Sequence, residues 1–192
     1  SDITRPRQVG QVQTCRGSHT HSVVSGPDEN GMIVVYNSGT SVVREEEELT
    51  GCIGNIAGDQ RTALFRIDVI EIPIDSPGDA RIVDSPGVFA EEETGVLAGL
   101  WRGGDHGGET QDTRATDQCH DITVFPATGI AAGACSGNGI VFDIADPRKP
   151  KRIDDVLDKG FAYWHSATFN NDGDKVIFTD EWGGGGRARC RT

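Results

Sequence analysis

The amino-acid sequence predicts an all-β fold, and three observations support this. Short apolar runs are separated by Gly, Pro, Asp and Asn, as in strands joined by tight turns. A histidine followed by an apolar strand recurs at His21, His120 and His165. A turn of the form Asp-Ile-x-x-Pro-Arg recurs at Asp2–Arg7 and Asp143–Arg148. A period of about 40–50 residues with several short strands per repeat predicts β-propeller blades of four antiparallel strands.

The clearest repeat unit spans residues 119–160. Its expected strands are His120–Phe125, Ile130–Cys135, Ile140–Ile144 and Arg152–Leu157, and its turns are Pro126–Gly129, Ser136–Gly139 and Asp146–Pro150. Asn138 and Gly139 are expected to supply the positive φ angles of a tight hairpin. The alanines and glycine of Ile130–Cys135 suit a crowded layer where sheets approach closely.

An earlier unit spans residues 19–86, with an insertion over residues 37–62. Its first strand contains Val23 and Val24, and its later strands are expected at Met32–Tyr36, Leu64–Ile72 and Ala80–Val83. The acidic run Glu45–Glu48 in the insertion is interpreted as a solvated face. A second polar insertion covers residues 87–118. Long excursions of this kind are either functional or mobile loops.

Both ends of the chain resemble incomplete units. Residues 1–18 match the end of a blade. Within them, Asp2–Val12 resembles the end of a third strand followed by a proline turn and an outer strand. Residues 161–192 match the start of a blade, with a strand ending at Phe169, a turn at Asn170–Asp174 and a strand at Lys175–Thr179. One domain of about three blade equivalents falls short of the four or more blades of a closed propeller. We therefore expect either a segment of a larger propeller, or open blades completed by other copies or by a protein partner.

The composition restricts the partners. The chain has 192 residues and a formal net charge of −12, which repels nucleic acid and anionic lipid. It contains no apolar run approaching the roughly 20 residues of a membrane span. These features predict that the chain neither binds nucleic acid nor inserts into a membrane.

Five cysteines form no Cys-x-x-Cys pair, which argues against a zinc ribbon or a thioredoxin motif. Cys119 and Cys135 flank one predicted hairpin, and Cys15 and Cys52 are expected to pair in the preceding unit. Cys190 is then left over. This arrangement predicts two disulfides and an exported protein, either extracellular, on the cell surface or periplasmic. The alternative is five buried, reduced thiols.

The second half of the chain resembles bacterial LVIVD-repeat proteins. The resemblance is carried by the segments Cys119–Ile122, Ala134–Ile140, Asp143–Pro147, Trp164–Gly173 and Thr179–Gly183. It implies an exported or surface-associated β-propeller, in a family whose members mostly have no assigned reaction. It therefore supports the fold and the location more than any chemistry.

The recurring histidines are the candidate site. The first strand of each propeller blade lines the central channel, so His21, His120 and His165 are expected to converge there. Three imidazoles with an open position can bind Zn, Cu or Fe, and the alternate ligands are His19, Asp121 and Asp180. The competing interpretation is that repeated histidines hydrogen-bond between blades. The function predicted first is a noncatalytic binding or assembly module, and the alternative is a metal-dependent, oxidoreductase-like enzyme.

Overall fold

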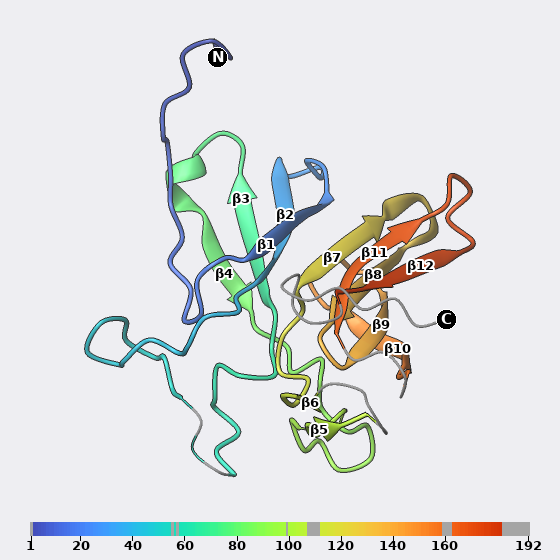
Figure 1. Cartoon of the computed structure of the whole chain (residues 1–192). Coiled ribbons are helices and arrows are strands. Elements are labelled where there is room, and N and C mark those ends of the chain that lie inside the picture. Colours follow the sequence, from blue (N-terminus) through green and yellow to red (C-terminus); the bar gives the residue numbers. More distant parts are fainter. Residues whose placement is uncertain are drawn as a thin grey trace.

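The computed structural model of the chain describes residues 2–54, 56, 58–98, 100–106, 112–158 and 163–181. It is an all-β structure with 37% strand and 4% helix (Figure 1). The elements in chain order are β1 (Thr20–Ser25), β2 (Met32–Ser38), β3 (Asp68–Pro73), η1 (Pro77–Asp79), β4 (Arg81–Asp84), β5 (Gly104–Asp105), β6 (Asp112–Thr113), β7 (Asp121–Phe125), η2 (Pro126–Thr128), β8 (Ile130–Cys135), β9 (Asn138–Asp143), β10 (Lys151–Val156), β11 (Trp164–Phe169) and β12 (Val176–Asp180).

The strands form antiparallel sheets in which neighbours in sequence are neighbours in space. One four-stranded sheet has the order β1-β2-β3-β4, and a second has the order β7-β8-β9-β10. A third sheet contains β11 and β12, and the short hairpin β5–β6 lies in the second insertion. The prediction of an all-β fold with antiparallel sheets is confirmed, although the described residues do not form a closed barrel or propeller.

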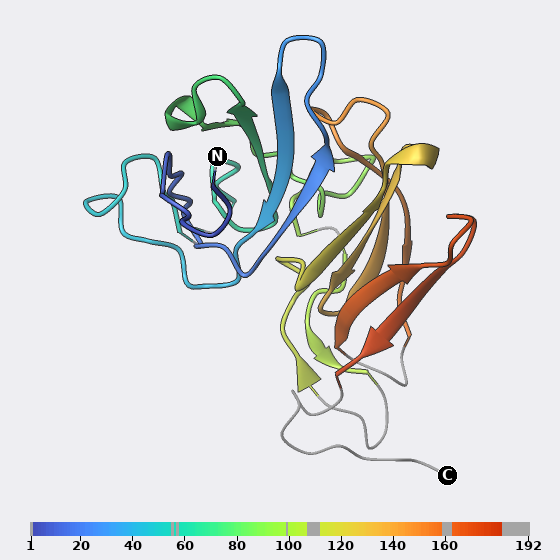
Figure 2. The same ribbon diagram turned by 90° about the horizontal axis from the view of Figure 1, so that it is seen from above.

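The first strands of the three larger sheets lie side by side, with β7 between β1 and β11 (Figures 1 and 2). Hydroxyl groups join these strands. Ser22 on β1 donates a hydrogen bond to the Ile122 carbonyl on β7, and Thr123 Oγ1 on β7 donates to the Ala167 carbonyl on β11 at 2.7 Å. The same contact is thus made at both junctions, which brings the starts of the three strands to one place.

The core lies in two layers on either side of β8. Ala131 and Cys135 face the first sheet, where they join a cluster of large apolar side chains that includes Tyr36 and Phe142. Ala132 and Ala134 face the third sheet and contact Ala167 together with Trp164, Phe169, Val176 and Phe178. Residues 131–135 are all buried, which confirms that this strand lies in a crowded layer. Small side chains are needed because both faces of β8 are covered.

Most predicted strands begin and end within two residues of the observed ones, but the third strand of the first sheet starts at Asp68 rather than at Leu64. Phe65 has a φ angle of 64°, outside the range of a strand. Its backbone N–H donates to the Asp117 carbonyl at 3.0 Å instead of to a neighbouring strand. Arg66 then donates to the carbonyls of Thr62 and Ser85, so this segment is used for tertiary contacts.

The β8–β9 hairpin is tighter than the sequence predicted. Cys135 pairs with Asn138, which leaves Ser136 and the next glycine as the turn, and Ser136 carries the positive φ of 56°. Asn138 is therefore a strand residue, and its side-chain oxygen accepts hydrogen bonds from the Trp101 backbone at 3.1 Å and from Thr116 Oγ1 at 2.7 Å. The prediction that Asn138 supplies a positive φ was wrong, because this side chain anchors the second insertion.

The N-terminal segment lacks the strand that the sequence predicted for it. The structure has a turn at Asp2–Arg5, closed by a 3.1 Å hydrogen bond between the end residues, but no strand over residues 6–18. The outer strand expected within Asp2–Val12 is therefore absent. This segment instead passes close to η1 and over the first sheet, with Gly10 against the Pro77 carbonyl. Cys190 and the rest of residues 182–192 lie outside the described residues.

The repeated proline turn joins the first two sheets. The Tyr36 hydroxyl on β2 donates to the Pro147 carbonyl at 2.8 Å, and Arg148 forms ion pairs with Asp28 at 2.9 Å and with Glu71. Burial raises the pKa of Tyr36. The turn that recurs in the sequence thus has a structural role at this sheet junction.

We expect Tyr36→Phe to lower the free energy of unfolding by about 1–2 kcal/mol, because it leaves the Pro147 carbonyl without its donor. Urea unfolding followed by intrinsic fluorescence measures this. An unchanged unfolding midpoint would show that the hydroxyl contributes nothing to the junction.

Candidate functional site

The starts of β1, β7 and β11 bring three histidines together. His19 Nε2 and His120 Nε2 lie 2.7 Å apart, and the His120 ring lies against the His165 ring with centroids separated by 4.0 Å. His19 is exposed, whereas His120 and His165 are half-buried. Each of the three comes from a different sheet or from the segment that leads into it. We call His19, His120, His165 and Glu181 the histidine cluster.

His120 is the central member of the cluster. Its Nδ1 lies 3.0 Å from the His165 backbone carbonyl, and its ring packs edge-on to Tyr163 at a centroid distance of 6.1 Å. Burial lowers the pKa of His120, and the neighbouring imidazoles of His165 and His19 lower it further. The neutral imidazole is therefore favoured at this position, and a neutral imidazole is the form that binds metal ions.

Glu181 follows β12 and closes the cluster on the third sheet. Its backbone N–H donates to the Tyr163 carbonyl at 2.9 Å, which holds it beside the start of β11. Its Oε2 lies 3.3 Å from His165 Nε2. One ligand atom each from His120, His165 and Glu181 lies within 4.8 Å of the others.

The structure places His21 elsewhere. Its Nδ1 lies 3.4 Å from Ser18 Oγ, and it lines a separate cavity of about 540 Å³ between the N-terminal segment and the first sheet. The residue equivalent to His120 is His19, because Ser22 follows His19 by three residues as Thr123 follows His120, and both hydroxyls bond the neighbouring first strand. Alignment of the repeats by sequence alone chose His21, which lies two residues after the structurally equivalent His19.

The two predicted aspartate ligands make structural contacts. The Asp121 carboxylate accepts a hydrogen bond from the Ala167 backbone N–H at 3.3 Å. It also lies 3.3 Å from Thr123 Oγ1, whose proton is donated to the Ala167 carbonyl. Asp180 Oδ1 accepts from the Tyr163 backbone N–H at 3.4 Å. Both carboxylates thus help to hold β11 in position, and the carboxylate that reaches the histidines is that of Glu181.

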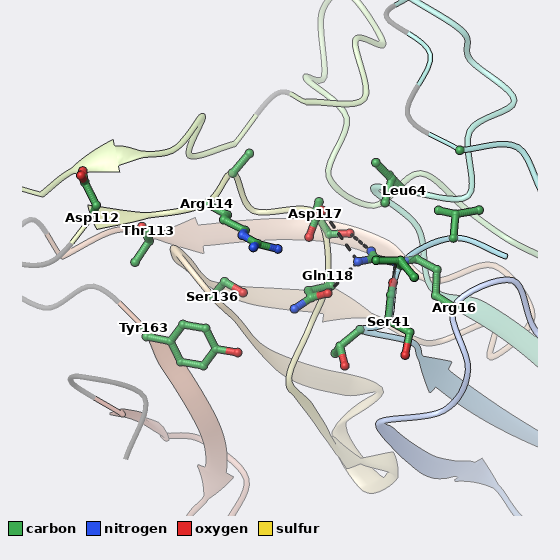
Figure 3. A pocket seen from close by; sticks show the side chains of 15 residues that line it. Arg16, Ser41, Leu64, Asp112, Thr113, Arg114, Asp117, Gln118, Ser136 and Tyr163 are labelled. Atoms are coloured by element: carbon green, nitrogen blue, oxygen red, sulfur yellow. Dashed lines mark hydrogen bonds and ion pairs between the residues drawn. The ribbon is translucent and has the colours of Figure 1, made fainter. Parts of the chain in front are cut away.

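A cavity of about 710 Å³ lies close to His120 in the fold, and Figure 3 shows the side chains that line it. Tyr163, whose ring packs against His120, also lines this cavity. Figure 3 shows the side chains of Arg114, Gln118 and Tyr163 directed toward its interior. Its polar lining residues include Arg16, Thr40, Ser41, Asp112, Thr113, Arg114, Asp117, Gln118, Ser136 and Tyr163. No sequence pattern indicates this lining, because its residues come from segments far apart in the chain.

Arg16 holds one wall of the cavity in place. Its guanidinium donates to the Ser41 carbonyl at 2.8 Å, to the Asp117 carbonyl at 3.0 Å and to Gln118 Oε1 at 2.8 Å. The Asp117 carboxylate lies 3.8 Å from the same guanidinium. Burial lowers the pKa of Arg16 and raises the pKa of Asp117, and the opposite charge of each partner acts against the shift. Arg16 thus joins the N-terminal segment and Ser41 of the first insertion to the segment that leads to His120.

Two disulfides cross-link the segments around the site. Cys15 is bonded to Cys52 and Cys119 to Cys135, as the sequence predicted. They indicate an oxidising, extracellular-type environment. The described helices are short, and none is long and apolar enough to cross a membrane. No protein-family model, curated protein or solved structure matches the chain.

Proposed function

We propose that this chain is part of an exported β-propeller of the LVIVD-repeat kind that serves as a noncatalytic binding and assembly module. Support for the propeller comes from the two four-stranded antiparallel sheets and from the first strands of three sheets lying side by side. The hydroxyl-to-carbonyl contact that repeats at both junctions supports a repeated unit. The two disulfides support export.

The observation that carries the assembly function is the open edge of the third sheet. β12 pairs with β11 and, among the described residues, with no other strand. An unpaired strand edge presents backbone donors and acceptors to a strand from another chain. The apolar residues Trp164, Phe169, Val176 and Phe178 around this sheet are only partly buried, so an added strand would also cover apolar surface. We assign the added strand to a second copy of the chain.

The test is the oligomeric state of the purified chain with a lysine on the edge strand. Ile177 on β12 is 65% exposed, and Ile153 on β10 is 53% exposed. We expect the unaltered chain to associate as its concentration rises, Ile177→Lys to be monomeric and Ile153→Lys to associate normally. Size-exclusion chromatography with light scattering measures all three. A monomer at every concentration, or equal association in both variants, would contradict pairing at β12.

The alternative function, a metal-dependent enzyme of the oxidoreductase type, is favoured by the histidine cluster beside the 710 Å³ cavity. Imidazole ligands next to a substrate-sized cavity are an arrangement that redox metal sites use. This function requires a redox-active ion, so the metal that copurifies with the protein distinguishes the two. Iron in stoichiometric amount would favour the enzyme over the binding module.

A further inference from the structure

We propose that His19, His120, His165 and Glu181 bind one divalent transition-metal ion, of the zinc–copper class, that ties the three sheets together at the starts of their first strands. His19 leads into β1 and His120 into β7, while His165 lies on β11 and Glu181 follows β12. An ion held by these four side chains would join all three sheets at one point. This inference goes beyond the proposed function and does not depend on assembly at β12.

The hydrogen bond at His120 Nδ1 sets the tautomer that a metal ligand needs. The His165 carbonyl, 3.0 Å away, can only accept a hydrogen bond, so Nδ1 carries the proton. In the neutral ring Nε2 then has a free lone pair, and this atom faces His19 Nε2 at 2.7 Å. Histidines that bind metals usually donate their other ring N–H to a carbonyl or carboxylate in this way, which orients the ring.

The ligand atoms of His120, His165 and Glu181 lie within 4.8 Å of one another, and that of His19 lies outside this set. Two ligands on a tetrahedral zinc ion, each about 2.0–2.1 Å from it, lie roughly 3.3–3.4 Å from one another. His165 Nε2 and Glu181 Oε2 already lie 3.3 Å apart. The 2.7 Å between His19 and His120 has to open by roughly 0.6 Å to reach that spacing. Binding the same ion also requires the exposed side chain of His19 to turn toward His165 and Glu181.

The chemistry of the four side chains selects the class of ion. Three imidazole nitrogens with one carboxylate oxygen suit Zn²⁺ and Cu²⁺, whereas Ca²⁺ and Mg²⁺ require mainly oxygen ligands. The carboxylate of Glu181 offsets part of the charge of the ion. Tyr163, whose ring packs edge-on to His120, lines the neighbouring cavity.

A chain of hydrogen bonds among the histidines would explain the distances without any ion, so the test measures the metal itself. The chelator-treated full chain is titrated with ZnCl₂ by calorimetry. We expect one ion per chain, and at least about 10–100-fold weaker binding in Glu181→Gln and in His165→Asn. The matched control is His21→Asn, which removes a neighbouring histidine outside the cluster and is expected to bind Zn²⁺ as tightly as the unaltered chain.

Two further readouts distinguish loss of ligands from loss of fold. Zn²⁺ is expected to raise the unfolding midpoint of the unaltered chain and of His21→Asn, but not that of Glu181→Gln. Cu²⁺ bound to the chain is expected to show nitrogen coupling in its electron paramagnetic resonance spectrum. No stoichiometric Zn²⁺ binding, or equal affinity in Glu181→Gln, His165→Asn and the control, would overturn the proposal. Unchanged Zn²⁺ binding in Ile177→Lys would show that the site is independent of assembly.

Discussion

Replacing Cys15 and Cys52 together by alanine is expected to lower the free energy of unfolding by about 4 kcal/mol. The disulfide joins residues 37 apart in sequence, and closing a loop of this size restricts the unfolded chain by about that amount. Beyond the end of β2 at Ser38, the first insertion contains no strand in its described residues, so few other contacts replace the cross-link. Equilibrium unfolding in urea, compared between the variant and the unaltered chain, measures the loss.

The Cys119–Cys135 disulfide provides the comparison. It joins residues only 16 apart and restricts the unfolded chain less, so its removal is expected to lower the free energy of unfolding by only about 3 kcal/mol. Mass mapping under nonreducing conditions checks both pairs directly. Five free thiols, or the same stability with and without reductant, would contradict both the pairing and its contribution to stability.

Substituting Arg16 by methionine is expected to cost about 3–5 kcal/mol, because it leaves a buried network without its cation. The carbonyls of Ser41 and Asp117 and the side-chain oxygen of Gln118 all lose their donor. The control is Arg114→Met, an exposed arginine of the same cavity, whose replacement is expected to change stability by less than about 0.5 kcal/mol. Thermal and urea unfolding measure both variants.

The loss in Arg16→Met is also expected to depend on pH. Burial already holds the pKa of Asp117 above its ordinary value, and removal of the guanidinium raises that pKa further. A carboxyl group whose pKa is raised by folding favours the folded state at low pH, and that advantage is lost as the pH rises through the raised pKa. The difference between variant and unaltered chain should therefore shrink as the pH falls from about 7 toward 4. A difference independent of pH would contradict the role of Asp117.

The sequence predicted the sheets better than the site. Alternating apolar residues and turn residues locate strands, so β8 was placed at its observed bounds and most others within two residues. Phe65 and Asn138 were misassigned because both are committed to contacts with the second insertion, far away in the chain. Local patterns contain no information on such contacts. Tertiary contacts decided the conformation at both positions.

The histidines illustrate the same limit. Their recurrence predicted that His120 and His165 occupy equivalent positions in successive units, and the structure brings these two together. The sequence also favoured His21 over His19, because the residues after His21 match the repeat more closely. The chain bends at His19, just before β1 begins, so the alternation of faces along the strand does not extend to it. Only the three-dimensional path identifies His19 as the equivalent residue.

The small side chains of β8 determine how closely the neighbouring sheets pack on its two faces. A methyl group added at Gly133 would lie 2.8 Å from Cys135 Sγ and 3.0 Å from Phe142, and Ala132 and Ala134 contact the third sheet on the opposite face. A larger side chain on either face of β8 would move the neighbouring sheet outward and increase the separation between the two sheets. The volume of a few side chains on one strand therefore sets the angle at which the neighbouring sheets pack against it.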